Sequence, residues 1–189
     1  MAYGHKILRQ TSVSIPSDFG ELNNLIANLW NTLHISGGVG LAAPQININK
    51  SIFVVDSTLL FNEIADAERN ELFDGDEGFK AVFINARIIN KSQHTWKYFE
   101  GCLSIPGINE MVERPRQIEI HYYDENFKPR CMEFSGYTAR VIQHEYDHVN
   151  GILFIDHLKP LKLRLLKNKL KKIVAGHVDV NYPMLFING

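Results

Sequence analysis

Residues 137–150 read YTARVIQHEYDHVN, and this stretch decides the fold that we expect. Four apolar side chains recur at the spacing of one helix face: Val141, Ile142, Tyr146 and Val149. This spacing predicts a buried helix over residues 137–150, which Gly151 would end. A buried helix lies inside a fold, so the other elements are expected to pack around it.

Two histidines of this helix are placed to bind one metal ion. His144 and His148 are four residues apart, so they lie one turn apart on one face, where both imidazoles can reach the same ion. Glu145 follows the first histidine directly, as the general base does in an H-E-x-x-H helix. The pattern would arise by chance in roughly 2% of chains of this composition. We therefore interpret the helix as part of a hydrolase whose metal activates water.

The helix supplies only two of the three protein ligands that a catalytic metal takes. Phe154 stands where a third histidine would follow, and residues 159–178 contain no Asp or Glu. Cys102, in the run EGCLS of residues 100–104, is the favoured third ligand because thiolate binds first-row metals strongly. The alternative for Cys102 is a small buried apolar residue. Cys131 is expected to be structural.

The composition fits one domain over residues 1–189. The chain has 45% hydrophobic and 22% charged residues and a formal net charge of -1. This charge provides no overall field for nucleic acid or a membrane. No stretch is long and apolar enough to span a bilayer, and the first residues lack the apolar core of a signal peptide. We therefore expect a cytoplasmic protein without a membrane partner.

Strands dominate the first two thirds of the sequence, and helices dominate the remainder. A helix is predicted to start with Ser17 or Asp18 as its N-cap and to end at residues 37–38. Strands are predicted at residues 51–56, 80–85, 117–123 and 130–134, and a last helix at residues 160–175. This order indicates an α+β fold: small antiparallel or mixed sheets packed around a central metal-binding helix, with a C-terminal helix.

Residues 62–78 differ in composition from the rest of the chain. They contain seven acidic residues and one basic residue, Arg69. Such a composition is typical of a solvated loop. We expect an excursion from the domain, with a helical turn near residues 63–69.

Three motifs in order resemble those of the peptide deformylases. GVGLAAPQ at residues 38–45 is similar to the family's G-x-G-L-A-A-x-Q, EGCLS at residues 100–104 to its E-G-C-L-S, and QHEYDH at residues 143–148 to its Q-H-E-x-D-H. The resemblance covers about residues 37–172. It implies a metal-dependent hydrolase that removes the N-formyl group from the first methionine of newly made polypeptides and releases formate. It also implies an Fe2+ ion in the cell, which Zn2+, Ni2+ or Co2+ can replace.

The resemblance also implies roles for individual residues in catalysis. Cys102, His144 and His148 would hold the ion. Glu145 would be the general base. Gln45, through its side-chain amide, and Leu103, through its backbone N–H, would stabilise the oxyanion that develops on the formyl group.

Further residues would bind the substrate or support the ligands. The backbone of Gly40 would pair with an extended peptide, and Tyr98 and Val141 would line the methionine pocket. Glu100, paired with Arg114, would orient the metal ligands. Residues 107–109 lack the arginine that is common at this point in the family, so peptide contacts there are expected to differ.

The helix predicted at residues 160–175 carries a basic face and an apolar stripe. From the residues alone, a solvated face over a core-packed helix explains this pattern best. The resemblance adds a second interpretation, because related enzymes bind the ribosome through a basic terminal helix. Phosphate contacts would make such binding depend on salt.

Two other functions are compatible with the helix motif. A metallopeptidase explains H-E-x-x-H but not the first two motifs. A structural metal site, as in a binding module, normally fills four positions with protein ligands, and only three are identifiable here. Cysteine with two histidines accepts several ions, so the donor set leaves the choice of metal open.

Overall fold

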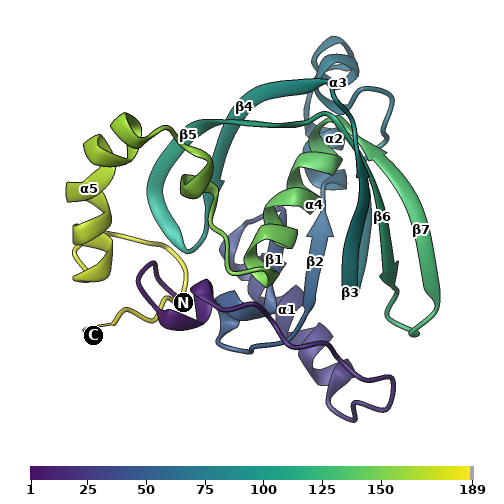
Figure 1. Ribbon diagram of the computed structural model, residues 1–189, viewed down its shortest axis with the longest axis horizontal. Helices are drawn as coiled ribbons and strands as arrows, with labels where there is room; N and C mark the ends of the chain where they lie inside the picture. The colour runs from purple at the N-terminus through teal and green to yellow at the C-terminus, as the bar shows by residue number, and fades with distance from the viewer. Residues whose placement is uncertain (188–189) are drawn as a thin grey trace.

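The computed structural model describes residues 1–187, in which two antiparallel sheets lie around a central helix (Figure 1). The larger sheet has the order β1-β2-β3-β6-β7, with bounds Gly40–Ala42, Ile52–Asp56, Lys80–Lys91, Gln117–Tyr123 and Pro129–Ser135. The smaller sheet pairs β4 (Thr95–Cys102) with β5 (Ile105–Pro115). The central helix is α4, Gly136–Val149. The predicted α+β fold is confirmed.

The central helix α4 is buried between the two sheets (Figure 1), which explains its mixed sequence. Its apolar residues Val141 and Ile142 pack with Phe53 and Phe83 of the larger sheet. Its buried Arg140 and His148 instead have hydrogen-bond partners on β4 and β5. Gly136 starts the helix at a φ of 52°, and a Cβ there would lie 2.4 Å from a backbone oxygen, so only glycine fits this position.

Helix α1, Leu22–Ser36, covers the other face of the larger sheet. It packs its leucines against β2 and β3 and ends as predicted, at Gly37, whose φ of 66° is left-handed. The predicted N-cap at Ser17 or Asp18 is wrong, because the helix begins after Glu21. The preceding residues form two turns of their own, in which Phe19 N–H donates to Pro16 O and Leu22 N–H to Phe19 O.

The acidic segment forms a helix where a helical turn was predicted, but it is folded against the domain rather than being a solvated excursion. It forms parts of α2, Thr58–Glu63, and all of α3, Asp66–Phe73. Leu72 and Phe73 at the end of α3 are buried, and the Phe73 ring lies 5.6 Å from that of Tyr137 on α4. The acidic side chains of α3 are exposed to solvent, while Leu72 and Phe73 pack the helix against α4. The many charges of the segment made these two apolar residues difficult to recognise in the sequence.

Helix α5, Pro160–Val174, and the residues that follow it lie on the side of the molecule opposite β7 (Figure 1). The 3-10 helix η3, Phe154–His157, leads into α5 as predicted. Leu166, Leu170 and Ile173 of α5 are buried. Residues 176–187, which we call the strap, then turn back toward the N-terminal segment, and Val178, Met184 and Phe186 pack into the same cluster as α5.

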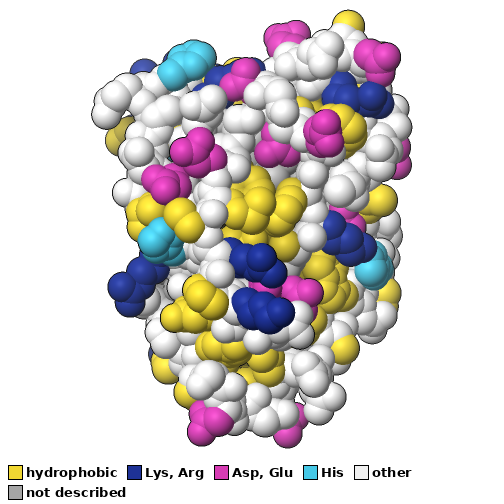
Figure 2. Space-filling view, turned by 90° about the vertical axis from the view of Figure 1, so that its right-hand side faces the viewer, with side chains coloured by type: hydrophobic (Ala, Val, Ile, Leu, Met, Phe, Trp, Pro, Cys, Tyr) yellow, Lys and Arg dark blue, Asp and Glu magenta, His cyan; other side chains and the backbone are white. Residues whose placement is uncertain are grey.

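Charges are mixed on the face that lies to the right in Figure 1. Figure 2 shows that hydrophobic, basic and acidic side chains are interspersed there. Such a surface creates no extended field of one sign. Within residues 1–187, no helix is long and apolar enough to cross a membrane.

Candidate active site

Three predicted metal ligands from two elements meet at the centre of the molecule. Cys102 ends β4, while His144 and His148 lie one turn apart on α4. One potential ligand atom from each of the three lies within 4.8 Å of the others, and Cys102 Sγ is 3.2 Å from His148 Nε2. Metal–ligand bonds of about 2.0–2.3 Å place neighbouring donors at such separations. The donor set and its spacing therefore fit one divalent ion.

The local backbone explains how Cys102 reaches α4. Residues Leu103 and Ser104 form the turn between β4 and β5, and Cys102 pairs with Ile105 after a register shift that follows Glu100. Gly101 allows a close packing here, because a Cβ would lie 2.2 Å from Asn109 Oδ1. The glycine in EGCLS thus accommodates the Asn109 carboxamide.

The charge state of Cys102 is set by its two histidine neighbours. Burial alone would raise the pKa of its thiol, but His148 and His144 outweigh burial and hold that pKa well below its usual range. The thiolate is the form of cysteine that binds metals. The site is thus prepared to accept a cation.

Buried charges behind the ligands fix the orientation of His144. Its Nδ1 lies 3.0 Å from Glu100 Oε2, so the other ring nitrogen is left for an ion. Arg114 donates to both oxygens of Glu100, at 2.6 and 2.9 Å. Burial opposes the charge of Glu100, but hydrogen bonds from His144 and Arg114 outweigh it and keep its pKa below the usual range.

This charged group is larger than the sequence suggested. Arg140 also donates to Glu100 and to the carbonyls of Val112 and Trp96. Arg114 reaches Asp147 at 2.8 Å. The signal for Arg140 was present in the sequence: an arginine four residues before His144 lies on the same face of a buried helix, where its charge needs a partner.

Glu145 lies beside the proposed ligands in a buried position. Its Oε2 has no hydrogen-bond partner among the described residues, and burial raises its pKa to about 7. A Cβ on Gly40 would lie 2.6 Å from Glu145 Oε1. Gly40 is therefore a glycine because the carboxylate occupies the space of a side chain.

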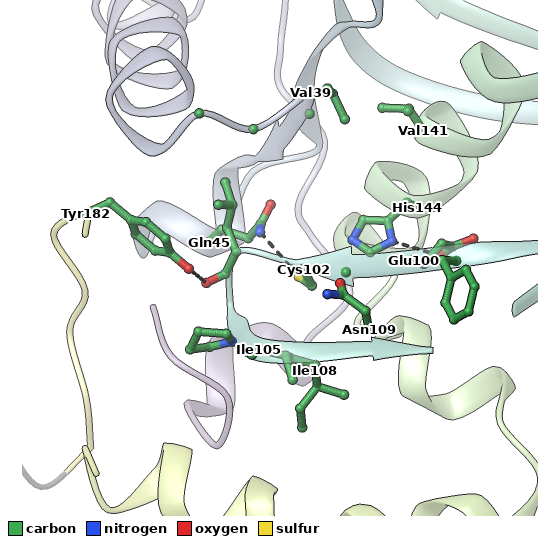
Figure 3. Close-up of a pocket in the computed structure, with 18 of the residues that line it drawn as sticks. Val39, Gln45, Glu100, Cys102, Ile105, Ile108, Asn109, Val141, His144 and Tyr182 are labelled. Carbon is green, nitrogen blue, oxygen red and sulfur yellow. Dashed lines mark hydrogen bonds and ion pairs between the residues drawn. The ribbon is translucent and has the colours of Figure 1, made fainter. Parts of the chain in front are cut away.

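Gln45 holds its side-chain amide in one orientation. Its Oε1 accepts a hydrogen bond from Ala42 N–H at 2.8 Å. Its Nε2 therefore points toward Ser104 Oγ at 3.3 Å and Cys102 Sγ at 3.8 Å. Figure 3 shows this amide between Cys102 and the aromatic side chain of Tyr182. The Gln45 N–H donor thus faces the space beside the Cys102 sulfur.

Gln45, Cys102, His144 and Glu145 line a cavity of about 810 Å³, while His148, 1% exposed, lies outside its lining. Gly40, Leu103 and Val141 line it as well. Tyr98 does not, which corrects the sequence prediction. Phe99, which is 61% exposed, lines the cavity instead, while Tyr98 packs against Trp96 and Tyr137. Phe99 and Tyr137 thus take the place predicted for Tyr98.

Comparison with known proteins decides between the functions that the motif allows. A family model described as polypeptide deformylase matches residues 1–164. The chain belongs to the peptide deformylase family. Its activity is the metal-dependent removal of the N-formyl group from new polypeptides, and the chain is a deformylase in this sense. The predicted function and enzyme class are confirmed.

Individual deformylases resemble the chain over nearly its whole length. The peptide deformylase of Christiangramia forsetii is 43% identical over 190 residues, which cover 100% of this chain and 95% of that protein. That of Flavobacterium johnsoniae is 42% identical over 186 residues, 98% of this chain and 94% of that protein.

Solved structures agree with this assignment. A Plasmodium falciparum peptide deformylase in complex with an inhibitor superposes with a TM-score of 0.75 at 33% identity, covering 93% of this chain and 98% of that one. Peptide deformylase 1B of Arabidopsis thaliana, also with an inhibitor, gives 0.78 at 29% identity, covering 94% and 90%.

One part of the deformylase cavity lies outside the residues that the family model matches. Asp179, Val180, Asn181 and Tyr182 of the strap line the cavity, and Tyr182 OH donates to Leu103 O at 2.9 Å. Sequence reasoning missed these residues because nothing in residues 176–187 marks a contact with a turn that lies far earlier in the chain.

Proposed function

We propose that Cys102, His144 and His148 hold the metal ion that the deformylase activity requires, and that the ion is Fe2+ in the cell. The observation that supports this most is the convergence of their three ligand atoms within 4.8 Å, beside a buried carboxylate. Three ligands leave a position for a reactant. Zn2+, Ni2+ or Co2+ suits the same donors.

When bound by these residues, the ion would supply Lewis-acid chemistry that polarises the formyl group and makes water more acidic. In the proposed mechanism the buried carboxylate of Glu145 takes a proton from the attacking water and returns it to the leaving amine. Gln45 Nε2 and Leu103 N–H donate to the formyl oxygen as it gains charge. Formate and a free N-terminal amine are the products.

The substrate is held, in this proposal, between β1 and the β4–β5 turn. β1 is an edge strand of the larger sheet, so its free edge at Gly40 can pair with an extended peptide. Val141, with Phe99 and Tyr137, lines the pocket for the methionine side chain. Glu100 and Arg114 keep His144 in position and do not contact the substrate.

A formate-release assay tests this function. Metal-loaded enzyme, kept anaerobic, is given formyl-Met-Ala-Ser and, in parallel, an unformylated protein substrate. We expect formate from the first and no cleavage of the second. Chelation should abolish release, and added Fe2+ should restore it. Cleavage of the unformylated protein, or formate release that survives complete metal removal, would refute the proposal.

Metal content tests the ligand assignment separately. Cys102→Ser, His144→Ala and His148→Ala should each bind metal much more weakly than the unsubstituted protein, measured by elemental analysis after dialysis. His94→Ala, at an exposed histidine outside both groups of side chains that could hold an ion, is the control and should bind normally. Full metal content in Cys102→Ser would contradict the assignment.

We further propose that residues 1–189 act as one catalytic domain in the cytoplasm and that α5 contacts the ribosome. Lys167, Lys171 and Lys172 of α5 are exposed, as are Leu161 and Leu165, at 70% and 71%. Reversal of these three lysine charges to Glu should weaken co-sedimentation with ribosomes at low salt, and the difference from the unsubstituted protein should shrink at higher salt. Reversal of Arg87, Lys91 and Lys128, elsewhere on the surface, is the control. Equal co-sedimentation of both variants would exclude this role of α5.

A further inference from the structure

We propose that the strap, residues 176–187, forms the wall of the cleft that receives the peptide beyond its formyl-methionine, and that Asp179 makes this wall favour basic over acidic side chains. The proposal rests on the function proposed above and extends it to substrate preference. Four strap residues line the cavity: Asp179, Val180, Asn181 and Tyr182. They follow residue 164, at which the match to the family model ends.

The strap is held in place along its length. Tyr182 OH donates to Leu103 O at 2.9 Å, and Leu185 O accepts from Ala2 N–H at 2.9 Å. Val178, Met184 and Phe186 pack into the apolar cluster beneath α5. Because anchors lie on both sides of residues 179–182, this part of the wall has a fixed position relative to the β4–β5 turn.

The path of the substrate leads toward the strap. The formyl end must lie near Glu145, which contacts Gly40. From Gly40 the cavity continues along Gly38 and Gly37, whereas Ala42 and Ala43 in the other direction are fully buried. A peptide that pairs with the edge of β1 must therefore leave past Gly37 and Gly38.

Leu103 connects this exit to the strap. Its Cδ1 lies 2.9 Å from the position that a Cβ would take on Gly38, and its carbonyl accepts the Tyr182 hydrogen bond. Figure 3 shows Tyr182 and Val141 at opposite ends of the site. The strap therefore faces the part of the peptide that leaves the site rather than the methionine pocket.

Asp179 gives this wall its charge. The other acidic and basic side chains that line the cavity are buried: Glu100, Arg140, His144 and Glu145. Asp179 is exposed, so a side chain at the exit meets its carboxylate. An ion pair between the exposed Asp179 and a substrate side chain would contribute little binding free energy. We therefore expect about a two- to fivefold preference in kcat/KM for a basic over an acidic residue at low salt, and less at high salt.

Matched peptides test the proposal. The series formyl-Met-X-Ser and formyl-Met-Ala-X, with X as Lys, Ser or Glu, is assayed with metal-loaded enzyme at low and at high salt. The preference for Lys over Glu should appear mainly in KM. Asp179→Asn should abolish it, and Asp179→Lys should reverse it. Glu125→Gln, at the β6–β7 turn, removes an exposed charge elsewhere and should keep the preference.

Tyr182→Phe tests the anchor, since it removes the hydroxyl and keeps the ring. If the anchor positions the wall, the preference for Lys over Glu should shrink. KM for these tripeptides should rise more than kcat falls. An unchanged Lys-to-Glu ratio in Asp179→Asn and Asp179→Lys, with formate released normally, would overturn the strap proposal alone. The absence of formate from every peptide would overturn the proposed function and the strap proposal with it.

Discussion

Glu145 combines a position next to a proposed ligand with a carboxylate oxygen that has no hydrogen-bond partner within residues 1–187. Its burial raises the pKa to about 7, which suits a group that accepts and returns a proton. Glu145→Gln keeps the shape and removes this capacity. We expect kcat for formate release to fall by about 10²–10⁴-fold with unchanged metal content. A variant with normal turnover would remove Glu145 from the mechanism.

A substitution at Gly40 tests whether the Glu145 carboxylate needs the space beside this residue. In Gly40→Ala the new Cβ would lie 2.6 Å from Glu145 Oε1, so Glu145 must shift. A displaced catalytic group costs about 10²-fold in rate, and kcat/KM for a formylated peptide measures it. Gly20→Ala is the control, because a Cβ there meets nothing within 4 Å. Equal rates in both variants would show that Glu145 tolerates the displacement.

The sequence predicts best those residues whose relation is local. His144 and His148 share a helix face, and that relation needs only the helical repeat. Cys102 lies on another element, and only the lack of a third ligand near the helix pointed to it. Tyr98 and Phe99 are adjacent aromatic residues on one strand, and the sequence does not determine which of the two lines the cavity.

At the scale of elements, one buried arginine joins α4 to the smaller sheet. Arg140 is 2% exposed and donates to Glu100 and to two carbonyls of β4 and β5. Arg140→Leu leaves these acceptors short of a donor in a buried setting. We expect a loss of about 3 kcal/mol in the free energy of unfolding, measured with urea. Arg87→Leu, exposed on β3, should cost far less; equal losses would contradict this account.

An ion pair between β2 and β3 makes the stability of the fold depend on pH. Asp56 lies 2.9 Å from Lys80 Nζ across the two strands. Burial opposes its charge, but hydrogen bonds from Thr58 and Lys80 outweigh burial and keep its pKa below the usual value. The stabilisation is therefore complete above the unfolded pKa of about 4 and is lost as the pH falls through the lower, folded pKa.

Asp56→Asn should remove this component of the acid response. Urea unfolding between about pH 2 and pH 6 should show a shallower loss of stability than in the unsubstituted protein. Asp18→Asn, in an exposed turn, should behave like the unsubstituted protein. An identical pH profile for Asp56→Asn would show that the carboxylate is not perturbed.

Elements were predictable where their repeat is strong. α1 and α5 each bury one face at the helical spacing, α4 is buried on nearly all sides, and the ends of all three were predicted to within a few residues except at the start of α1. For α3 a helical turn was predicted but its docking was not, because seven charges dominate the composition of the segment, and Leu72 and Phe73 become informative only once α4 is there to receive them.

For the whole molecule, the metal site joins elements that are far apart in sequence. An ion that binds only the folded state stabilises it by about 2.7 kcal/mol at a concentration of 100 times Kd. For a chain of this size, such a gain raises Tm by about 5–10 °C. Chelation should lower Tm by this amount, as measured by calorimetry, and should leave His148→Ala nearly unchanged. An equal drop in His148→Ala would place the effective ion elsewhere.

The hydrogen bond between Ala2 and Leu185 has a consequence for the timing of activity. Its two partners are separated by almost the entire polypeptide, and so are many residues of the cluster that surrounds it. Contacts of this kind carry a large loop-closure cost and form late in folding. During translation, the region under α5 can assemble only after Leu185 has emerged from the ribosome, so the strap completes the cleft after α4 and the β4–β5 turn are already available to fold.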